Sequence, residues 1–111
     1  MSESGLSERE LALLRGVLRR HPEVTKAKLF GSRAKGTHTQ NSDIDIALWG
    51  DIHRVIPIRV AGELEELPLP YTFDVQAFEA TKTESLREEI ETLGVEIYRN
   101  SRPQSGSEFR L

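Results

Sequence analysis

The sequence LFGSRAKGTHTQNSDIDIALW, residues 29–49, holds the pattern that decides the fold. It begins with the end of an apolar segment and turns at Gly31-Ser32. A short basic segment and a polar segment follow. The last part alternates apolar residues with Asp43 and Asp45, which is the period of a strand with one apolar and one carboxylate face. We therefore expect a strand, a glycine turn and a second strand that carries paired carboxylates.

A helix is predicted upstream of this stretch. Ser7 and Glu10 have the spacing of a capping box, in which each residue's side chain bonds the backbone of the other. One apolar stripe follows at helical spacing and consists of Leu11, Leu14, Val17 and Leu18. The pattern ends near His21-Pro22, because proline disfavours helix at the residue before it.

Residues 25–30 then alternate as a half-buried strand does. We interpret Lys26 and Lys28 as the solvated face of an edge strand. After Gly31, Ser32 is of a residue type that caps helices, and we expect it to cap a short helix that reaches Lys35. Residues 37–42 are expected to form a polar loop.

Downstream, the apolar spacing predicts two more helices and two more strands. The first helix carries Val60, Ala61, Leu64 and Leu67, and the second carries Leu86, Ile90 and Leu93 after a capping box of Thr81 and Glu84. Residues 71–78 form the third expected strand, with Asp74 on its polar face, and residues 95–98 form the fourth. This order predicts an α/β (α+β) fold, a mixed central sheet with helices packed on one face.

Length and composition set the remaining bounds. The 111 residues suit one domain over residues 6–100, between flexible ends at 1–5 and 101–111. We expect a cytoplasmic protein, since the sequence has no cysteine, no signal peptide and no membrane-spanning apolar run. The net charge of −3 argues against direct nucleic-acid binding, which usually needs a basic excess.

The carboxylates suggest a metal site. Asp43 and Asp45 lie two residues apart on one strand face, and Asp74 lies on the polar face of another strand. Carboxylates that converge repel one another unless a cation or a proton lies between them. Mg²⁺ prefers such oxygen ligands together with substrate phosphates, and three carboxylates suit a two-metal site for phosphoryl or nucleotidyl transfer.

The Gly31-Ser32 turn suits a phosphate. Gly31 lets the backbone approach an anion, and Ser32 offers a hydroxyl and an amide. Arg33 and Lys35 add positive charge beside the turn, although the sequence does not show which of them faces the ligand. For Trp49, a structural aromatic is favoured over a role in an adenine pocket or a partner interface.

These motifs resemble a known family. Gly31-Ser32, ten residues and then Asp43-Ile44-Asp45 are similar to the signature of the DNA polymerase beta-type nucleotidyltransferase superfamily, and LFGSRAKG…SDIDIAL with PYTFDVQAF resembles its minimal nucleotidyltransferase (MNT) branch. The resemblance implies a nucleotidyltransferase fold, ATP as nucleotide donor and Mg²⁺ held by the first two aspartates. It also implies that Asp74 shares a metal and acts as base toward the acceptor hydroxyl.

The resemblance also implies a partner. Minimal members often pair with a HEPN-domain toxin and act as its antitoxin by transferring AMP to it. A non-catalytic antitoxin that neutralises its partner by binding is the alternative. Transfer to a small molecule such as an aminoglycoside is a weaker alternative. Larger relatives bind their acceptors with an extra helical domain, which this sequence lacks.

Overall fold

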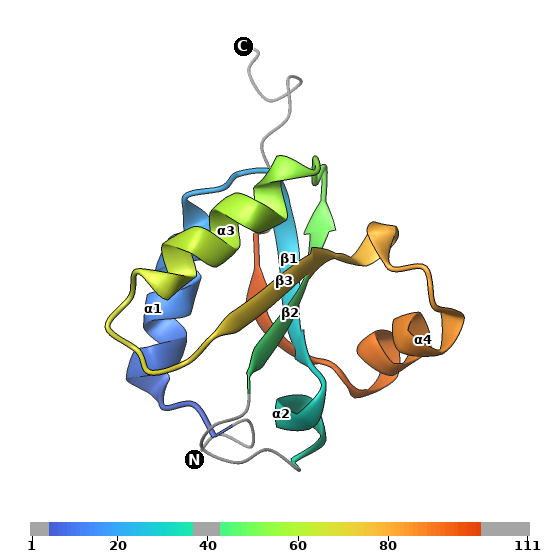
Figure 1. The fold of residues 1–111 in the computed structure, drawn as a ribbon, viewed down its shortest axis with the longest axis horizontal. Coiled ribbons are helices and arrows are strands. Elements are labelled where there is room, and N and C mark those ends of the chain that lie inside the picture. The colour runs from blue at the N-terminus through green and yellow to red at the C-terminus, as the bar shows by residue number, and fades with distance from the viewer. Residues whose placement is uncertain (1–4, 37–42, 101–111) are drawn as a thin grey trace.

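One mixed sheet organises the part of the chain that the computed structural model describes, residues 5–36 and 43–100 (Figure 1). Its strands are β1 (Val24–Phe30), β2 (Ile44–Gly50), β3 (Phe73–Ala77) and β4 (Val95–Arg99), in the order β3-β2-β1-β4. β1 pairs antiparallel with β2 and β4, whereas β2 and β3 are parallel. The parallel pair needs a crossover connection, and α3 (Val55–Glu65) provides it.

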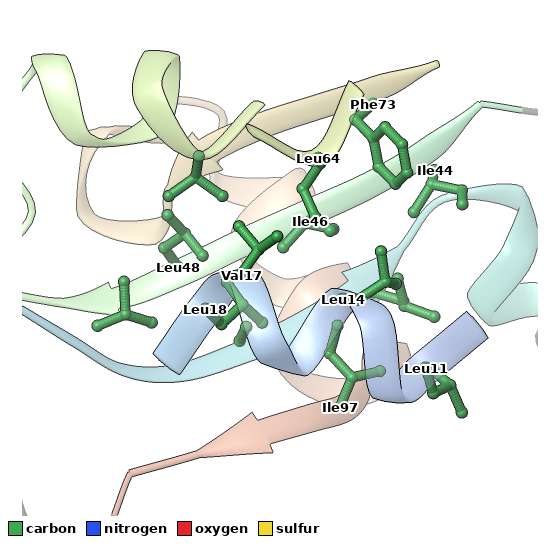
Figure 2. Close-up of a cluster of buried hydrophobic side chains, with 14 of the residues drawn as sticks. Leu11, Leu14, Val17, Leu18, Ile44, Ile46, Leu48, Leu64, Phe73 and Ile97 are labelled. Carbon is green, nitrogen blue, oxygen red and sulfur yellow. The ribbon is translucent and has the colours of Figure 1, made fainter. Parts of the chain in front are cut away.

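The alternation in β2 separates the two faces of the sheet. Ile44, Ile46 and Leu48 are fully buried on the first face. Figure 2 shows these side chains packed with others of the main core, among them Leu14, Val17, Leu18, Leu64 and Ile97. Helix α1 (Glu8–Arg19) and helix α3 supply the helical part of this core, because their apolar stripes face the sheet. The predicted mixed sheet and its α+β class are confirmed.

A second, smaller core lies on the opposite face. Phe30 and Ala47 point away from the main core and pack with Phe78 and Ile90. Phe78 begins the 3-10 helix η1 (Phe78–Ala80), and Ile90 lies on α4 (Glu84–Leu93). The prediction that the helices pack on one face of the sheet therefore holds for α1 and α3. It does not hold for α4, whose Ile90 packs on the opposite face.

Two local predictions have clear outcomes. The capping box at α1 is confirmed, with the Glu10 amide donating to Ser7 Oγ at 3.1 Å and the Ser7 amide to Glu10 Oε1 at 2.9 Å. The second capping box is wrong, because the N-cap of α4 is Thr83. Thr81 is instead buried, and its hydroxyl donates to the carbonyl of Ala77.

The remaining expectations concern the two ends of the chain, the segment 37–42 and membrane spans. The predicted polar loop 37–42 and tail 101–111 lie outside the described residues, as does the N-terminal segment apart from Gly5. None of the helices in residues 5–36 and 43–100 is long and apolar enough to cross a membrane.

Ile46→Ala is expected to lower the free energy of unfolding by about 3 kcal/mol, because it leaves a cavity under the central strand. Ile58→Ala removes the same atoms from a side chain that is 71% exposed on α3 and serves as the matched control. Urea titration of both variants measures the difference. An equal loss of unfolding free energy in the two variants would contradict the assignment of the main core to the sheet face that carries Ile46.

Candidate functional site

The Gly31-Ser32 turn joins β1 to the short helix α2 (Ser32–Lys35). Gly31 has φ 77° and ψ −150°, a backbone conformation that is essentially restricted to glycine. Its carbonyl accepts hydrogen bonds from the amides of Ala34 and Lys35, each at 3.1 Å, which closes the single turn of α2. A Cβ added at Gly31 would overlap Oδ2 of Asp45. The turn and this carboxylate are therefore direct neighbours.

Asp45 and Asp74 lie side by side on the second face of the sheet. They are register partners in the parallel pair β2–β3, where neighbouring strands lie about 4.8 Å apart. Asp43 precedes β2 and accepts a hydrogen bond from the hydroxyl of Thr72. The amide of Ile44 donates to the carbonyl of Thr72 at 3.0 Å. These contacts bring the three predicted carboxylates to one end of the parallel pair.

Burial and the neighbouring carboxylates change the ionisation of Asp45. Burial is the largest cause, and the charges of Asp74 and then Asp43 add to it, so that the pKa of Asp45 rises from 3.8 to about 6. All three causes disfavour the charged form. A cation placed among the carboxylates would oppose these contributions, because it favours the charged form of Asp45.

The donor chemistry fits magnesium. Mg²⁺ is commonly held by one or two carboxylates together with substrate phosphates and water. Asp45 and Asp74 supply such a pair, and Asp45 lies directly beside the Gly31-Ser32 turn. Across residues 5–36 and 43–100, no group of three or more His, Cys, Asp or Glu side chains is gathered closely enough to hold a metal ion by itself.

The two cationic residues of α2 have different surroundings. Arg33 is only 2% exposed, and its guanidinium carbon lies 4.9 Å from the centre of the Tyr71 ring. The side chain of Lys35 is 44% exposed, and its Nζ lies 3.4 Å from Oε1 of Glu89 on α4. Lys35 is therefore the more accessible of the two predicted phosphate contacts.

Trp49 has a structural position. Its ring stacks on Phe78 with centroids 4.5 Å apart, and Lys26 Nζ lies 4.4 Å from the Trp49 centroid. Two groups this close to the ring centre must occupy opposite faces, so neither face is open to an adenine base.

The edge-strand interpretation of Lys26 and Lys28 is wrong, because β1 lies between β2 and β4.

Sequence reasoning missed the residues that connect these groups. Tyr71 and Thr72 were expected inside the third strand, but β3 begins at Phe73. Tyr71 contacts Arg33, and Thr72 contacts Asp43. The only available signal was their place directly before the strand that carries Asp74.

Comparison with known proteins settles the family. Residues 13–103 match the family model described as polymerase beta, nucleotidyltransferase. The chain belongs to this nucleotidyltransferase family. The resemblance inferred from its motifs is thereby confirmed. No curated protein matches the sequence significantly.

Solved structures support the same nucleotidyltransferase fold. A chain from the crystal structure of a toxin–antitoxin complex with AMP-PNP is similar over 86% of this chain and 76% of its own, with 26% identity and a TM-score of 0.67. A chain of the MntA–HepT toxin–antitoxin is 22% identical, with coverages of 85% and 74% and a TM-score of 0.65. A third comes from the tri-AMPylated HEPN toxin of Shewanella oneidensis in complex with MNT antitoxin, with 20% identity, coverages of 86% and 74%, and a TM-score of 0.65.

Gly31→Ala is expected to lower the free energy of unfolding by about 3 kcal/mol and to abolish AMP-PNP binding, because the new methyl group overlaps Asp45 in a strained backbone conformation. Gly36→Ala is the control, since Gly36 also has a positive φ of 78° but an added Cβ there would meet no atom of residues 5–36 and 43–100 within 4 Å. It should lose about 1 kcal/mol and retain binding. Calorimetry with AMP-PNP and thermal unfolding provide the two measurements, and retained binding in Gly31→Ala would contradict the expected contact.

Asp45→Asn is expected to stabilise the metal-free protein in a pH-dependent way. An acid whose pKa is raised by folding contributes its stability below the unfolded value of 3.8, and loses that contribution as pH rises through about 6. At about pH 8 the neutral asparagine should therefore increase the free energy of unfolding, by about 1 kcal/mol after allowance for the solvent exposure of this half-buried site. Chemical denaturation with a chelator present, at about pH 8 and about pH 4, measures the change; a gain that is no larger at the higher pH would refute the raised pKa of Asp45.

Proposed function

We propose that this nucleotidyltransferase is the antitoxin of a HEPN/MNT toxin–antitoxin pair and transfers AMP from ATP to a hydroxyl of its HEPN partner. The observation that carries the proposal is the close approach of Gly31 to Asp45, which is the register partner of Asp74. The solved relative that is 26% identical is a toxin–antitoxin complex with AMP-PNP, which supports both the nucleotide and the type of partner. Because ATP is the donor, we place the reaction in the cytoplasm.

Residues 6–100 would form the catalytic domain, with the donor nucleotide at one end of the parallel pair. Gly31 and Ser32 would hold the triphosphate through the backbone and the hydroxyl. Lys35 would exchange Glu89 for a phosphate oxygen. Two bound Mg²⁺ ions would neutralise the phosphate charge and orient the triphosphate, with Asp43, Asp45 and Asp74 as their protein ligands.

The transfer itself follows from this placement. The acceptor oxygen attacks the α-phosphorus of ATP and forms a new P–O bond. The bond from the α-phosphorus to the β-phosphate oxygen breaks, and pyrophosphate leaves. Asp74, an exposed carboxylate on the edge strand β3, would accept the proton of the attacking hydroxyl, which is the role that the family resemblance implies. The turn and Asp45 hold the donor while the partner brings the acceptor.

Asp45→Asn is expected to lower transfer of α-labelled AMP to the HEPN partner by about 10²-fold or more, because it removes a charged ligand at the reacting phosphate. The assay contains Mg²⁺, labelled ATP and the co-purified partner, and it follows label on the partner by gel and mass spectrometry. Asp51→Asn is the matched control, since Asp51 is an exposed carboxylate directly after the other end of β2 and should retain full transfer.

The same variants separate catalysis from binding. If the wild-type chain neutralises the toxin and Asp45→Asn does not, although both form the complex, transfer carries the antitoxin function. If Asp45→Asn neutralises as well as the wild type, the non-catalytic antitoxin is correct and the enzymatic proposal fails. Labelling of an aminoglycoside in place of the partner would support the small-molecule alternative.

A further inference from the structure

Arg33 is the charged side chain that the catalytic proposal leaves without a role. It lies on α2, directly after Ser32, yet only 2% of it is exposed. A buried guanidinium is costly unless its surroundings compensate the charge. The aromatic ring of Tyr71 does so in part, because a cation within about 6 Å of a ring centre is attracted by the ring's quadrupole. The phosphate turn is therefore attached to Tyr71.

Tyr71 is in turn fixed to the first helix. Its hydroxyl donates to Oε2 of Glu10 at 3.1 Å. The other carboxylate oxygen of Glu10 accepts the Ser7 amide in the capping box of α1. Burial, and then the hydrogen bond to Glu10, raise the pKa of Tyr71, which keeps its hydroxyl a donor. The ring that contacts Arg33 is thus held at both its face and its hydroxyl.

Tyr71 also leads directly into the carboxylate pair. The next residue, Thr72, bonds Asp43 through its hydroxyl and the amide of Ile44 through its carbonyl. Two residues further, Asp74 lies beside Asp45. A displacement of Tyr71 would therefore move Thr72 and Asp74, while a displacement of Arg33 would move Ser32.

We propose that Arg33 is a positioning residue that, through Tyr71, sets the phosphate turn at a fixed distance from the strand bearing Asp74. This inference rests on the proposed nucleotidyl transfer for its kinetic consequence. In-line transfer requires the triphosphate and the base to be aligned, and a misplacement of about 1 Å can cost about 10²-fold in rate. Arg33 then acts on the rate of transfer without touching the nucleotide.

The kinetic test compares Arg33→Met, Arg33→Lys and Tyr71→Leu with the wild type. Arg33→Met keeps an unbranched stem and removes the charge; it should lower kcat for AMP transfer by about tenfold or more and change KM for ATP by less than about threefold. Arg33→Lys restores a cation over the ring and should recover most of kcat. Tyr71→Leu should also lower kcat, and the loss in the double variant should be smaller than the two single losses combined, because both changes remove the contact between Arg33 and Tyr71.

A matched control separates positioning from simple destabilisation. Arg87 on α4 stacks on Phe78 at 4.5 Å, which is the same type of contact outside the site. Arg87→Gln should lower the melting temperature without changing kcat. If Arg33→Met lowers kcat only as far as Arg87→Gln does at equal loss of stability, the positioning role is refuted. A rise in KM for ATP in both Arg33 variants, with Tyr71→Leu normal, would instead show a direct phosphate contact and overturn the proposal.

Hydrogen exchange tests the same link without catalysis. In Tyr71→Leu, amide exchange of residues 31–36 should accelerate although Tyr71 lies on another segment, and in Arg33→Met exchange of residues 71–74 should accelerate. Arg87→Gln should change neither segment. If the wild type transfers no nucleotide, the proposed function fails while this measurement still decides the positioning role. Unchanged exchange in both variants would overturn it.

Discussion

The absence of a side chain at Gly31 is the constraint on which the site depends. Any larger residue would overlap the carboxylate of Asp45, so the close approach of the Gly31-Ser32 turn to β2 is possible only with glycine. The antiparallel pairing of β1 with β2 produces this approach, because Phe30 at the end of β1 is the register partner of Asp45. Phe30 and Asp45 are distant in the sequence, and the strand pairing brings them together. The turn and the carboxylate are thus placed by strand pairing.

The same arrangement carries a cost in stability. Folding brings Asp45 close to two other carboxylates and partly removes it from water, and the protein compensates with buried aliphatic side chains on the opposite face of the same strand. β2 therefore has two functions that alternate along its length. The side chains of Ile44, Ile46 and Leu48 stabilise the fold, whereas Asp45, together with Asp43 directly before the strand, concentrates negative charge.

Much of this could be predicted from the sequence, because the information is local. The alternation of β2, the capping box at Ser7 and the spacing between Gly31 and Asp43 each depend on a few neighbouring residues. Strand order is a long-range property, and Lys26 and Lys28 therefore gave no sign that β1 is an interior strand. Arg33 and Lys35 look equivalent in the sequence. In the structure Arg33 is buried and lies against Tyr71, from a segment about forty residues away, whereas Lys35 stays accessible.

Trp49 is the only tryptophan in the chain, and this has a practical consequence. Its ring lies between an aromatic ring and an ammonium group, on the same strand as Asp45 but at the other end. Intrinsic fluorescence therefore reports how η1 and the lysines of β1 are packed, at a distance from any bound nucleotide. A change in emission when ATP and a metal ion are added would mean that β2 had shifted along its length or that η1 had moved. The native sequence thus contains an optical probe of the sheet itself, with no added label.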